Sequence, residues 1–271
     1  MAGESGFPKI DKSVPSPARV WNYWVGGKDN FASDRAIAEQ LLTVLPTLPL
    51  IARLTRQFLG QAVDLLASEY GIRQFLDIGS GLPVADNTHE VAQRAAPSSR
   101  VVYVDNDPVV VSHANALLRS GPQGRCAYVL ADLRDMDTML AGAVKTLDFT
   151  RPVAVLLLQV LHFVPDADDP YGLVARLMSA VPSGSFLVLA HGPSDVDRDA
   201  GEQITRLYQS TASPVRPRSA DEVARFFEGL ELLGPGLTAG TEWLASGPGG
   251  GTHPILPDGF SFGYNAIARK P

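Results

Sequence analysis

The chain has 271 residues, of which 45% are hydrophobic and 19% are charged, and its formal net charge is −6. This apolar fraction is enough to fill the core of one α/β domain with an accessory segment, which excludes a disordered chain. The negative charge argues against nucleic acid and anionic lipid as partners, since both are bound by basic surfaces.

The sequence contains no targeting signal that we recognise. Its first residues lack a basic segment followed by an apolar stretch, and no apolar run reaches the roughly 18 residues of a transmembrane helix. We therefore expect a cytoplasmic protein without a membrane partner. The single cysteine, Cys126, excludes an internal disulfide and a cysteine-based zinc cluster. Histidines and carboxylates show no compact ligand spacing, so no metal is predicted.

Two short helices are predicted near the start of the chain. Ser16 and Pro17 have the residue types of an N-cap and a first helical position. The helix that they open can end at Gly26 and Gly27, because glycine tolerates the left-handed conformation at a helix end. A second helix is predicted from Ser33.

A third, longer helix is predicted over residues 49–70. Its apolar side chains recur at near-helical spacing, and Gly71 supplies the stop. The apolar faces of these helices must pack against another part of the protein. We therefore predict a helical cap or lid in residues 1–73 and a second domain in residues 74–271.

After the third helix the pattern changes to short apolar runs separated by helical stretches, as in a parallel sheet. Their apolar character indicates strands that are buried on both faces. Five such strands are predicted, at residues 75–79, 101–105, 127–132, 153–160 and 185–192.

The C-terminal part of the chain adds a helix and two more strands. Ser219 and Glu222 form a capping box for the helix, and the strands are predicted within residues 230–233 and 260–270. The link over residues 234–259 is rich in glycine and proline and too long for a tight turn. We expect this link to lie over a site.

Glycines and carboxylates occur where the first three strands end. Open parallel sheets bind ligands beyond the carboxyl ends of their strands. Gly79 and Gly81 let the backbone approach a ligand closely after the first strand. Asp105 ends the second strand, where a carboxylate can accept both hydroxyls of an adenosine ribose. Asp132 ends the third and can accept the exocyclic amine of adenine.

The loop after the first strand favours S-adenosylmethionine over a nicotinamide dinucleotide. The dinucleotide fingerprint has a third glycine where Val84 stands. Asn87 and Glu90 have the pattern of an N-cap and its N3 partner, so the next helix starts late and leaves a wide loop suited to an amino-acid tail. Asp77 is placed to face the ammonium of a methionine moiety, whereas it would repel a pyrophosphate.

These segments resemble class I S-adenosylmethionine-dependent methyltransferases, whose first three motifs look like FLDIGSGLP, YVDNDP and LADL. The chain is similar, nearly end to end, to one bacterial family of S-adenosyl methyltransferases formerly described as a domain of unknown function. That similarity lies in SPARVWNYWVGGKDNFASDRAIAE, DIGSGLP, VVYVDNDP, LHFVPD, residues 219–236 and GYNAIARK. The sequence departs from the general class at Pro83, where a third glycine is usual.

The resemblance implies a Rossmann-like α/β fold with a seven-stranded sheet whose last strand is antiparallel. It also implies S-adenosylmethionine as the cofactor. By the same resemblance, the cofactor pocket is lined by residues at the ends of the first four strands: Gly79, Ser80, Gly81, Asp105, Asn106, Asp132, Leu133 and Gln159.

The aromatic segment before Gly26 is a candidate lid, since a mobile, polar stretch lies beside it. The alternative is plain packing of a short helix against the body. Within this segment we expect Tyr23 and Lys28 to contact the methionine end of the cofactor, with Lys28 paired to its carboxylate.

The catalytic residues are not evident from the sequence. His162 and His191 follow the fourth and fifth strands and are candidates for a general base or a substrate ligand, although a structural, hydrogen-bonded histidine is the alternative for each. Methyl transfer depends largely on positioning, so the absence of a triad does not exclude an enzyme.

The expected function is methyl transfer to an unidentified small-molecule acceptor, because this fold hosts many acceptors and the sequence identifies none. Two alternatives stay open: a non-catalytic S-adenosylmethionine-binding protein and a nicotinamide-dependent oxidoreductase. The oligomeric state is not predicted.

Overall fold

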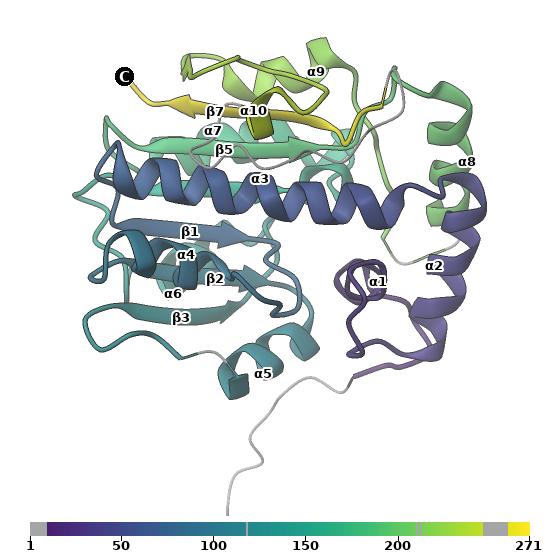
Figure 1. Cartoon of the computed structure of the whole chain (residues 1–271), viewed down its shortest axis with the longest axis horizontal. Helices are drawn as coiled ribbons and strands as arrows, with labels where there is room; N and C mark the ends of the chain where they lie inside the picture. The colour runs from purple at the N-terminus through teal and green to yellow at the C-terminus, as the bar shows by residue number, and fades with distance from the viewer. Residues whose placement is uncertain (1–9, 118, 210, 212, 246–259) are drawn as a thin grey trace, which may run out of the picture.

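The computed structural model describes residues 10–117, 119–209, 211, 213–245 and 260–271. Within them a single mixed sheet lies at the centre, with helices on both of its faces (Figure 1). This is the predicted Rossmann-like α/β architecture.

All seven predicted strands are present. They are β1 (Gln74–Ile78), β2 (Arg100–Asp105), β3 (Arg125–Leu130), β4 (Ala154–Leu158), β5 (Phe186–His191), β6 (Glu231–Leu232) and β7 (Tyr264–Arg269). Their order in the sheet is β3-β2-β1-β4-β5-β7-β6. The first five are parallel, and β7 runs antiparallel to both of its neighbours, as expected. The strand order reverses between β1 and β4, which opens a crevice at their carboxyl ends.

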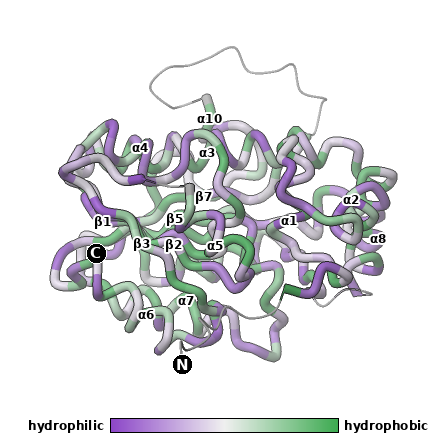
Figure 2. Tube along the Cα trace, turned by 90° about the horizontal axis from the view of Figure 1, so that it is seen from below, coloured by the Kyte–Doolittle hydropathy of each residue, from purple (hydrophilic) through white to green (hydrophobic). Residues whose placement is uncertain are grey.

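Helices cover each face of the sheet. One face carries α3 (Leu48–Ser68), α4 (Thr88–Ala95) and α10 (Glu242–Ala245), and the other carries α6 (Met136–Ala143), α7 (Pro170–Ser179) and α9 (Ala220–Ala224). A further helix, α5 (Pro108–Leu117), packs against β2 and β3. Hydrophobic residues run along the strands between these layers (Figure 2).

The central strands are buried because both of their faces are covered. In β1, Leu76 and Ile78 pack into the cluster formed with α6 and α7, whereas Phe75 packs against α3 and α4. Successive side chains of a strand point to opposite faces, so a strand covered on both sides reads as a continuous apolar run.

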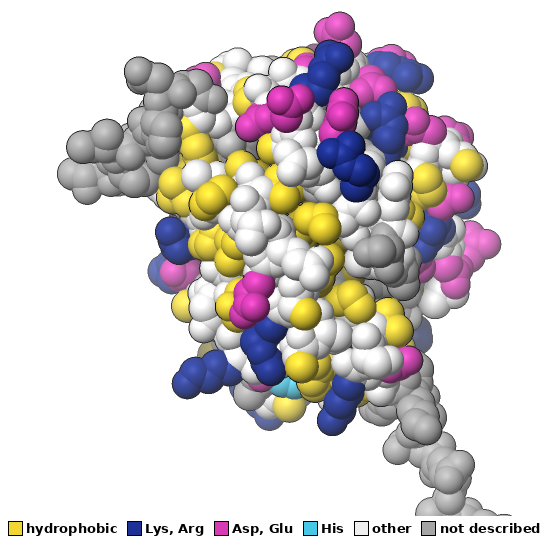
Figure 3. All heavy atoms as spheres, turned by 90° about the vertical axis from the view of Figure 1, so that its right-hand side faces the viewer, with side chains coloured by type: hydrophobic (Ala, Val, Ile, Leu, Met, Phe, Trp, Pro, Cys, Tyr) yellow, Lys and Arg dark blue, Asp and Glu magenta, His cyan; other side chains and the backbone are white. Residues whose placement is uncertain are grey.

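A separate hydrophobic cluster lies beyond the carboxyl ends of the strands. It joins α1 (Pro17–Trp24), α2 (Ala32–Val44), α8 (Arg198–Gln209) and the first turns of α3. We call α1, α2 and α8 the cap. Figure 1 shows the cap at the right, past the arrowheads of β1 and β2. Figure 3 looks onto this end, where hydrophobic side chains lie among charges of both signs.

The helix signals in the sequence have the predicted geometry. Pro17 is the first residue of α1, and Gly26 follows it with φ +83°. The capping box of α4 is formed, with the Asn87 backbone N–H donating to Glu90 Oε2 at 2.8 Å. The predicted third helix is α3, which packs along one face of the sheet. Residues 246–259 of the predicted link lie outside the described residues.

In the described part of the chain, no single helix combines the length and apolarity needed to cross a membrane, and only the bent pair α2 and α3 passes that test together. The described residues also contain no group of three or more histidine, cysteine and carboxylate side chains arranged to hold a metal ion.

Candidate cofactor and acceptor site

A cavity of about 520 Å³ lies between the cap and the carboxyl ends of β1 to β4. This position is the crevice that the strand order creates. The cavity brings together nine of the predicted cofactor residues: Asp77, Gly79, Ser80, Gly81, Asp105, Asn106, Asp132, Leu133 and Gln159.

The glycine loop after β1 is tight at its start. Gly79 and Gly81 have φ values of +70° and +67°, in the left-handed region that favours glycine. A Cβ on Gly79 would lie 2.7 Å from a methyl carbon of Val160, so the loop packs directly against the turn after β4. A Cβ on Gly81 would meet no heavy atom within 4 Å, so this backbone is open to a ligand on the cavity side.

The rest of this loop is wide, as predicted, because α4 does not begin until Thr88. The backbone N–H of Val84 donates to Asn87 Oδ1 at 3.2 Å. On its outer side the loop is held by Arg56 of α3, whose guanidinium donates to the carbonyls of Ala85 and Asp86 at 3.3 and 3.0 Å. Arg56 also lines the cavity, although it was not among the residues expected there.

Asp105 is a buried carboxylate at the end of β2. Its Oδ2 accepts the backbone N–H of Gly81, and its Oδ1 accepts that of Asp107, each at 2.9 Å. Burial raises the pKa of Asp105 to about 6. A carboxylate has about four acceptor positions. Asp105 therefore keeps acceptor capacity toward the cavity after its two backbone contacts are made.

Asp77 and Arg56 bring opposite charges to the cavity near the glycine loop. Asp77 Oδ2 accepts the hydroxyl of Thr88 at 2.6 Å. Burial raises the pKa of Asp77, while the Thr88 hydrogen bond and the positive charge of Arg56 act in the opposite direction. An amino-acid tail, which carries an ammonium and a carboxylate, matches this pair of charges.

Asp132 lies in a hydrogen-bonded group at the end of β3. Asn106 donates to its Oδ2 at 3.0 Å, and Arg134 pairs with its Oδ1 at 2.7 Å. Arg134 also pairs with Asp168 at 3.1 Å. These contacts, chiefly the side-chain hydrogen bonds of Arg134, lower the pKa of Asp132. Asp132 is thus held ionised, and its two oxygens accept four hydrogen bonds, one from Asn106 and three from the backbone and guanidinium of Arg134.

A buried arginine fastens the first helix of the cap to the sheet. Arg19 pairs through Nε with Asp34 of α2 and through Nη1 with Asp107 beyond β2, both at 2.9 Å. Its third nitrogen donates to the carbonyl of Val14 at 2.7 Å. Because Asp107 lies two residues after Asp105, this network fixes α1 beside the cofactor residues. Arg19 was not among the residues expected at the site.

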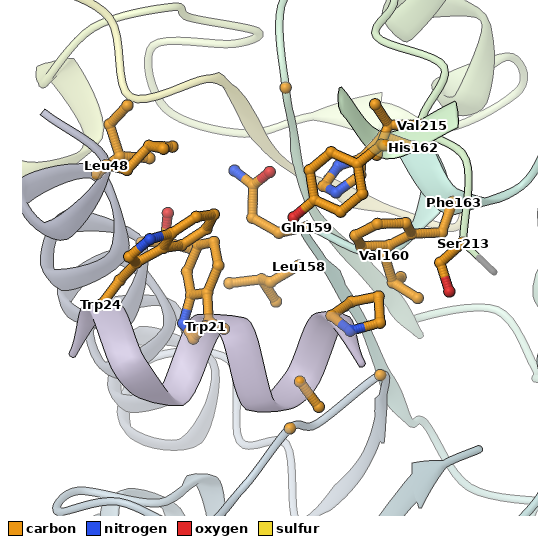
Figure 4. Close-up of a pocket in the computed structure, with 18 of the residues that line it drawn as sticks. Trp21, Trp24, Leu48, Leu158, Gln159, Val160, His162, Phe163, Ser213 and Val215 are labelled. Atoms are coloured by element: carbon orange, nitrogen blue, oxygen red, sulfur yellow. The ribbon is translucent and has the colours of Figure 1, made fainter. Parts of the chain in front are cut away.

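The aromatic segment of α1 faces the cavity with a different set of residues from those expected. Trp21, Asn22 and Trp24 line the cavity, and Figure 4 shows both tryptophans opposite Gln159. Tyr23 and Lys28 are not among the lining residues. The Tyr23 hydroxyl donates to Glu39 Oε1 at 3.2 Å, and Lys28 is exposed. Trp21 and Trp24 are three positions apart and share a helix face, from which Tyr23 points away.

His191 is a fully buried histidine behind the site. Its Nδ1–H donates to the carbonyl of Gly192 at 2.8 Å, and its Nε2 lies 3.2 Å from Nη1 of Arg218, which donates to it. Burial lowers the pKa of His191 to about 4. Arg218 also donates to the carbonyls of Leu161 and Val164, at 2.9 Å each. His191 thus supports the turn after β4 and does not line the cavity.

His162 lies on that turn and does line the cavity (Figure 4). Its Nδ1 is buried and has no hydrogen-bond partner. Burial, together with the nearby His191 and Arg218, lowers its pKa well below the usual value, so the ring is neutral. Gln159, on the same turn, has φ +55°, a sparsely populated conformation for a residue with a side chain.

The strand order, the glycine loop and the carboxylates at three strand ends together define a Rossmann-like S-adenosylmethionine-binding domain of the class I methyltransferases. The family model of S-adenosyl methyltransferases matches residues 4–271, and the chain belongs to that family. S-adenosylmethionine is accordingly its cofactor.

Two solved structures are similar over nearly the whole chain. A DUF574 family protein from Streptomyces avermitilis is 41% identical, with 97% of this chain and 100% of the other covered and a TM-score of 0.91. A candidate methyltransferase from Thermobifida fusca is 36% identical, with 95% and 96% covered and a TM-score of 0.83. The plantazolicin methyltransferase BpumL, at 13% identity and a TM-score of 0.53, shares the fold. A search of the curated proteins gave no match.

Proposed function

We propose that the protein transfers the methyl group of S-adenosylmethionine to a small-molecule acceptor that binds between the cap and the turn after β4. The observation that carries this proposal is that one cavity joins the cofactor residues at the strand ends to His162 and the cap helices. A cavity of about 520 Å³ is in the usual range for small-ligand sites.

The side chains support one orientation of the cofactor. Asp132 would accept the amine of adenine in place of one of the donors from Asn106 and Arg134 that now occupy its oxygens. Asp105 would accept a ribose hydroxyl, and Asp77 with Arg56 would hold the charged ends of the methionine part. The sulfonium would then lie past the glycine loop, near Gln159. When bound, S-adenosylmethionine would supply an electrophilic methyl carbon, which a nucleophile attacks in line with the departing sulfur.

The protein's own contribution is to position the reactants and to exclude water. Trp21 and Trp24 cover the cavity from the cap side, and Arg19 fixes the helix that carries them. In-line displacement gains much of its rate from orientation. Two reactants that are already bound in contact have lost their translational and rotational freedom before the reaction step, so that loss no longer adds to the barrier. A covered cavity also favours a small acceptor over a macromolecule.

Release of S-adenosylhomocysteine tests the proposal against a non-catalytic binder. The protein is incubated with S-adenosylmethionine and chromatographic fractions of bacterial metabolites, and the product is measured by mass spectrometry. We expect at least one fraction to raise product release above the rate with cofactor alone. At a concentration of S-adenosylmethionine near the wild-type Kd, the increase should be much smaller in Asp105→Asn and kept in Asp137→Asn, which changes an exposed aspartate on α6. Tight cofactor binding without release from any fraction would instead identify a binding protein.

A further inference from the structure

The cofactor residues account for only one part of the cavity lining. The remaining part is formed by the cap, the turn after β4 and residues 213–217 and 260–262, and it is apolar and rich in aromatic rings. Its aromatic members other than His162 are Trp21, Trp24, Phe163, Tyr208, Phe260 and Phe262.

Charged side chains are concentrated on the cofactor side. Among the lining residues, Arg56, Asp77, Asp105, Asp132 and Arg134 all lie at the ends of β1 to β3 or on α3. The remaining charged one is Asp197, an exposed residue whose Oδ1 accepts the backbone N–H of Ala200 at 3.0 Å. A charged acceptor would therefore lose its hydration in the apolar part without gaining a partner of opposite charge.

The apolar part adjoins the place where the methyl group would lie. His162 and Gln159 both belong to the turn after β4, the strand that pairs with β1. On this turn Val160 packs against Gly79 of the cofactor loop. Figure 4 shows Gln159 and His162 on one side of the cavity and the tryptophans of α1 on the other. A flat ring between these two walls would contact both the aromatic lining and the imidazole.

We infer that the acceptor is an uncharged aromatic molecule with a hydroxyl group, a phenol, and that His162 accepts the hydroxyl proton during transfer. This inference rests on the proposed function. The phenolic oxygen forms the new bond to the methyl carbon, and the carbon–sulfur bond breaks with its electron pair kept on sulfur. The proton moves to the imidazole of His162, so the positive charge passes from the sulfonium to the imidazolium, which then releases the proton to solvent.

Other side chains near this position fit the role less well. His191 already uses both ring nitrogens within the protein. The Asn22 amide oxygen accepts from the Asp29 backbone and from Asn30, at 3.0 and 2.9 Å. Gln159 can donate to or accept from the acceptor but is not a base. His162 is thus the neutral, unengaged base among them.

Binding and turnover of simple phenols test the inference. With S-adenosylhomocysteine bound, the probes 2-naphthol, 7-hydroxycoumarin and 7-hydroxyflavone are titrated while tryptophan fluorescence is followed, and 2-naphthoate serves as the charged analogue of the first. We expect at least one phenol to bind, and 2-naphthol to bind roughly tenfold or more tightly than 2-naphthoate. With S-adenosylmethionine, the phenol that binds should be converted to its methyl ether.

The role of His162 is tested with His162→Gln and a matched control, His113→Gln, on α5 and away from the cavity lining. We expect His162→Gln to lower kcat for the phenol by about 100-fold or more, because a general base typically contributes that factor. KM and the affinity for S-adenosylhomocysteine should stay within about threefold, since the residue is not needed for cofactor binding. His113→Gln should match the wild type.

Two results would overturn the inference while leaving the proposed function intact. One is tight S-adenosylhomocysteine binding with no phenol bound or methylated, and the other is an unchanged kcat in His162→Gln. The proposed function itself fails only if no metabolite fraction releases S-adenosylhomocysteine, so the two failures are distinguishable.

Discussion

Replacing Asp105 by asparagine removes one negative charge from the position where we place the ribose. The two carboxylate oxygens each accept a backbone N–H, from Gly81 and Asp107. Asparagine has a single acceptor oxygen, so it can keep one of these contacts, and its amide nitrogen replaces an acceptor with a donor. A ribose hydroxyl then loses its charged partner.

The expected loss of affinity follows from these contacts. A hydrogen bond to a charged group contributes about 1.5 to 3 kcal/mol. Since Asp105 has only its remaining acceptor positions for the ligand, we count one such bond, about 2 kcal/mol. This corresponds to a roughly 30-fold rise in the Kd of S-adenosylhomocysteine. The free energy of unfolding should change by only about 1 kcal/mol, because removing a buried charge offsets the lost N–H contact.

Isothermal titration calorimetry at pH 8 measures the effect with Asp105 ionised, because this pH lies above its raised pKa of about 6. Asp137→Asn is the matched control, since it makes the same chemical change at an exposed site on α6. Equal affinities of Asp105→Asn and the wild type would refute the assignment of the ribose to this carboxylate.

Four further outcomes are expected. Since the ionised form of Asp105 is the stronger acceptor for a ribose hydroxyl, the affinity for S-adenosylhomocysteine should fall as the pH drops through about 6, and calorimetry should show no such fall in Asp105→Asn. Gly81 and Gly71 have φ values of +67° and +68°, and each has open space where a Cβ would lie. Replacing either by alanine should lower the free energy of unfolding by a similar amount, about 1 kcal/mol, but only Gly81→Ala should weaken the binding of S-adenosylhomocysteine. Arg19→Met leaves the buried carboxylates of Asp34 and Asp107 without their cation, so urea denaturation should show that the free energy of unfolding falls by about 3 to 5 kcal/mol. A decrease below about 1 kcal/mol would contradict the stabilising role of these ion pairs. His191→Gln should lower Tm in a thermal melt yet bind S-adenosylhomocysteine within about threefold of wild type; weaker binding at an unchanged Tm would contradict a structural role.

The sheet and the cofactor loop were predictable because their signals are local in sequence. Each buried strand appears as one apolar run, and the capping box at Asn87 fixes where α4 begins. The carboxyl ends of parallel strands meet at one edge. Residues after separate strands, such as Asp77, Asp105 and Asp132, could therefore be grouped without a structure.

The arginines of the site could not be predicted, because their roles depend on contacts between distant parts of the chain. Arg19 meets Asp107 across 88 positions, and Arg56 meets Asp86 across 30. Sequence gives no sign of such pairs when each arginine lies in an ordinary helical pattern. The second carboxylate of the VVYVDNDP segment, Asp107, was a weak signal that a cation lies nearby.

Which face of α1 lines the cavity could also not be predicted from the sequence. The chemistry of the aromatic segment before Gly26 points to Tyr23 and Lys28, whereas the structure places Trp21 and Trp24 on the cavity. A rotation of about 100° per residue decides which side chains point inward, and only the packing of α1 against α2 fixes that phase.

The shape and charges of the strand-end cavity suit S-adenosylmethionine and not a dinucleotide. Calorimetric titration of the wild-type protein with S-adenosylhomocysteine and, separately, with NAD measures this preference. We predict a Kd in the micromolar range for S-adenosylhomocysteine, about −8 kcal/mol, and no binding heat with NAD. Clear binding of NAD without binding of S-adenosylhomocysteine would contradict the account.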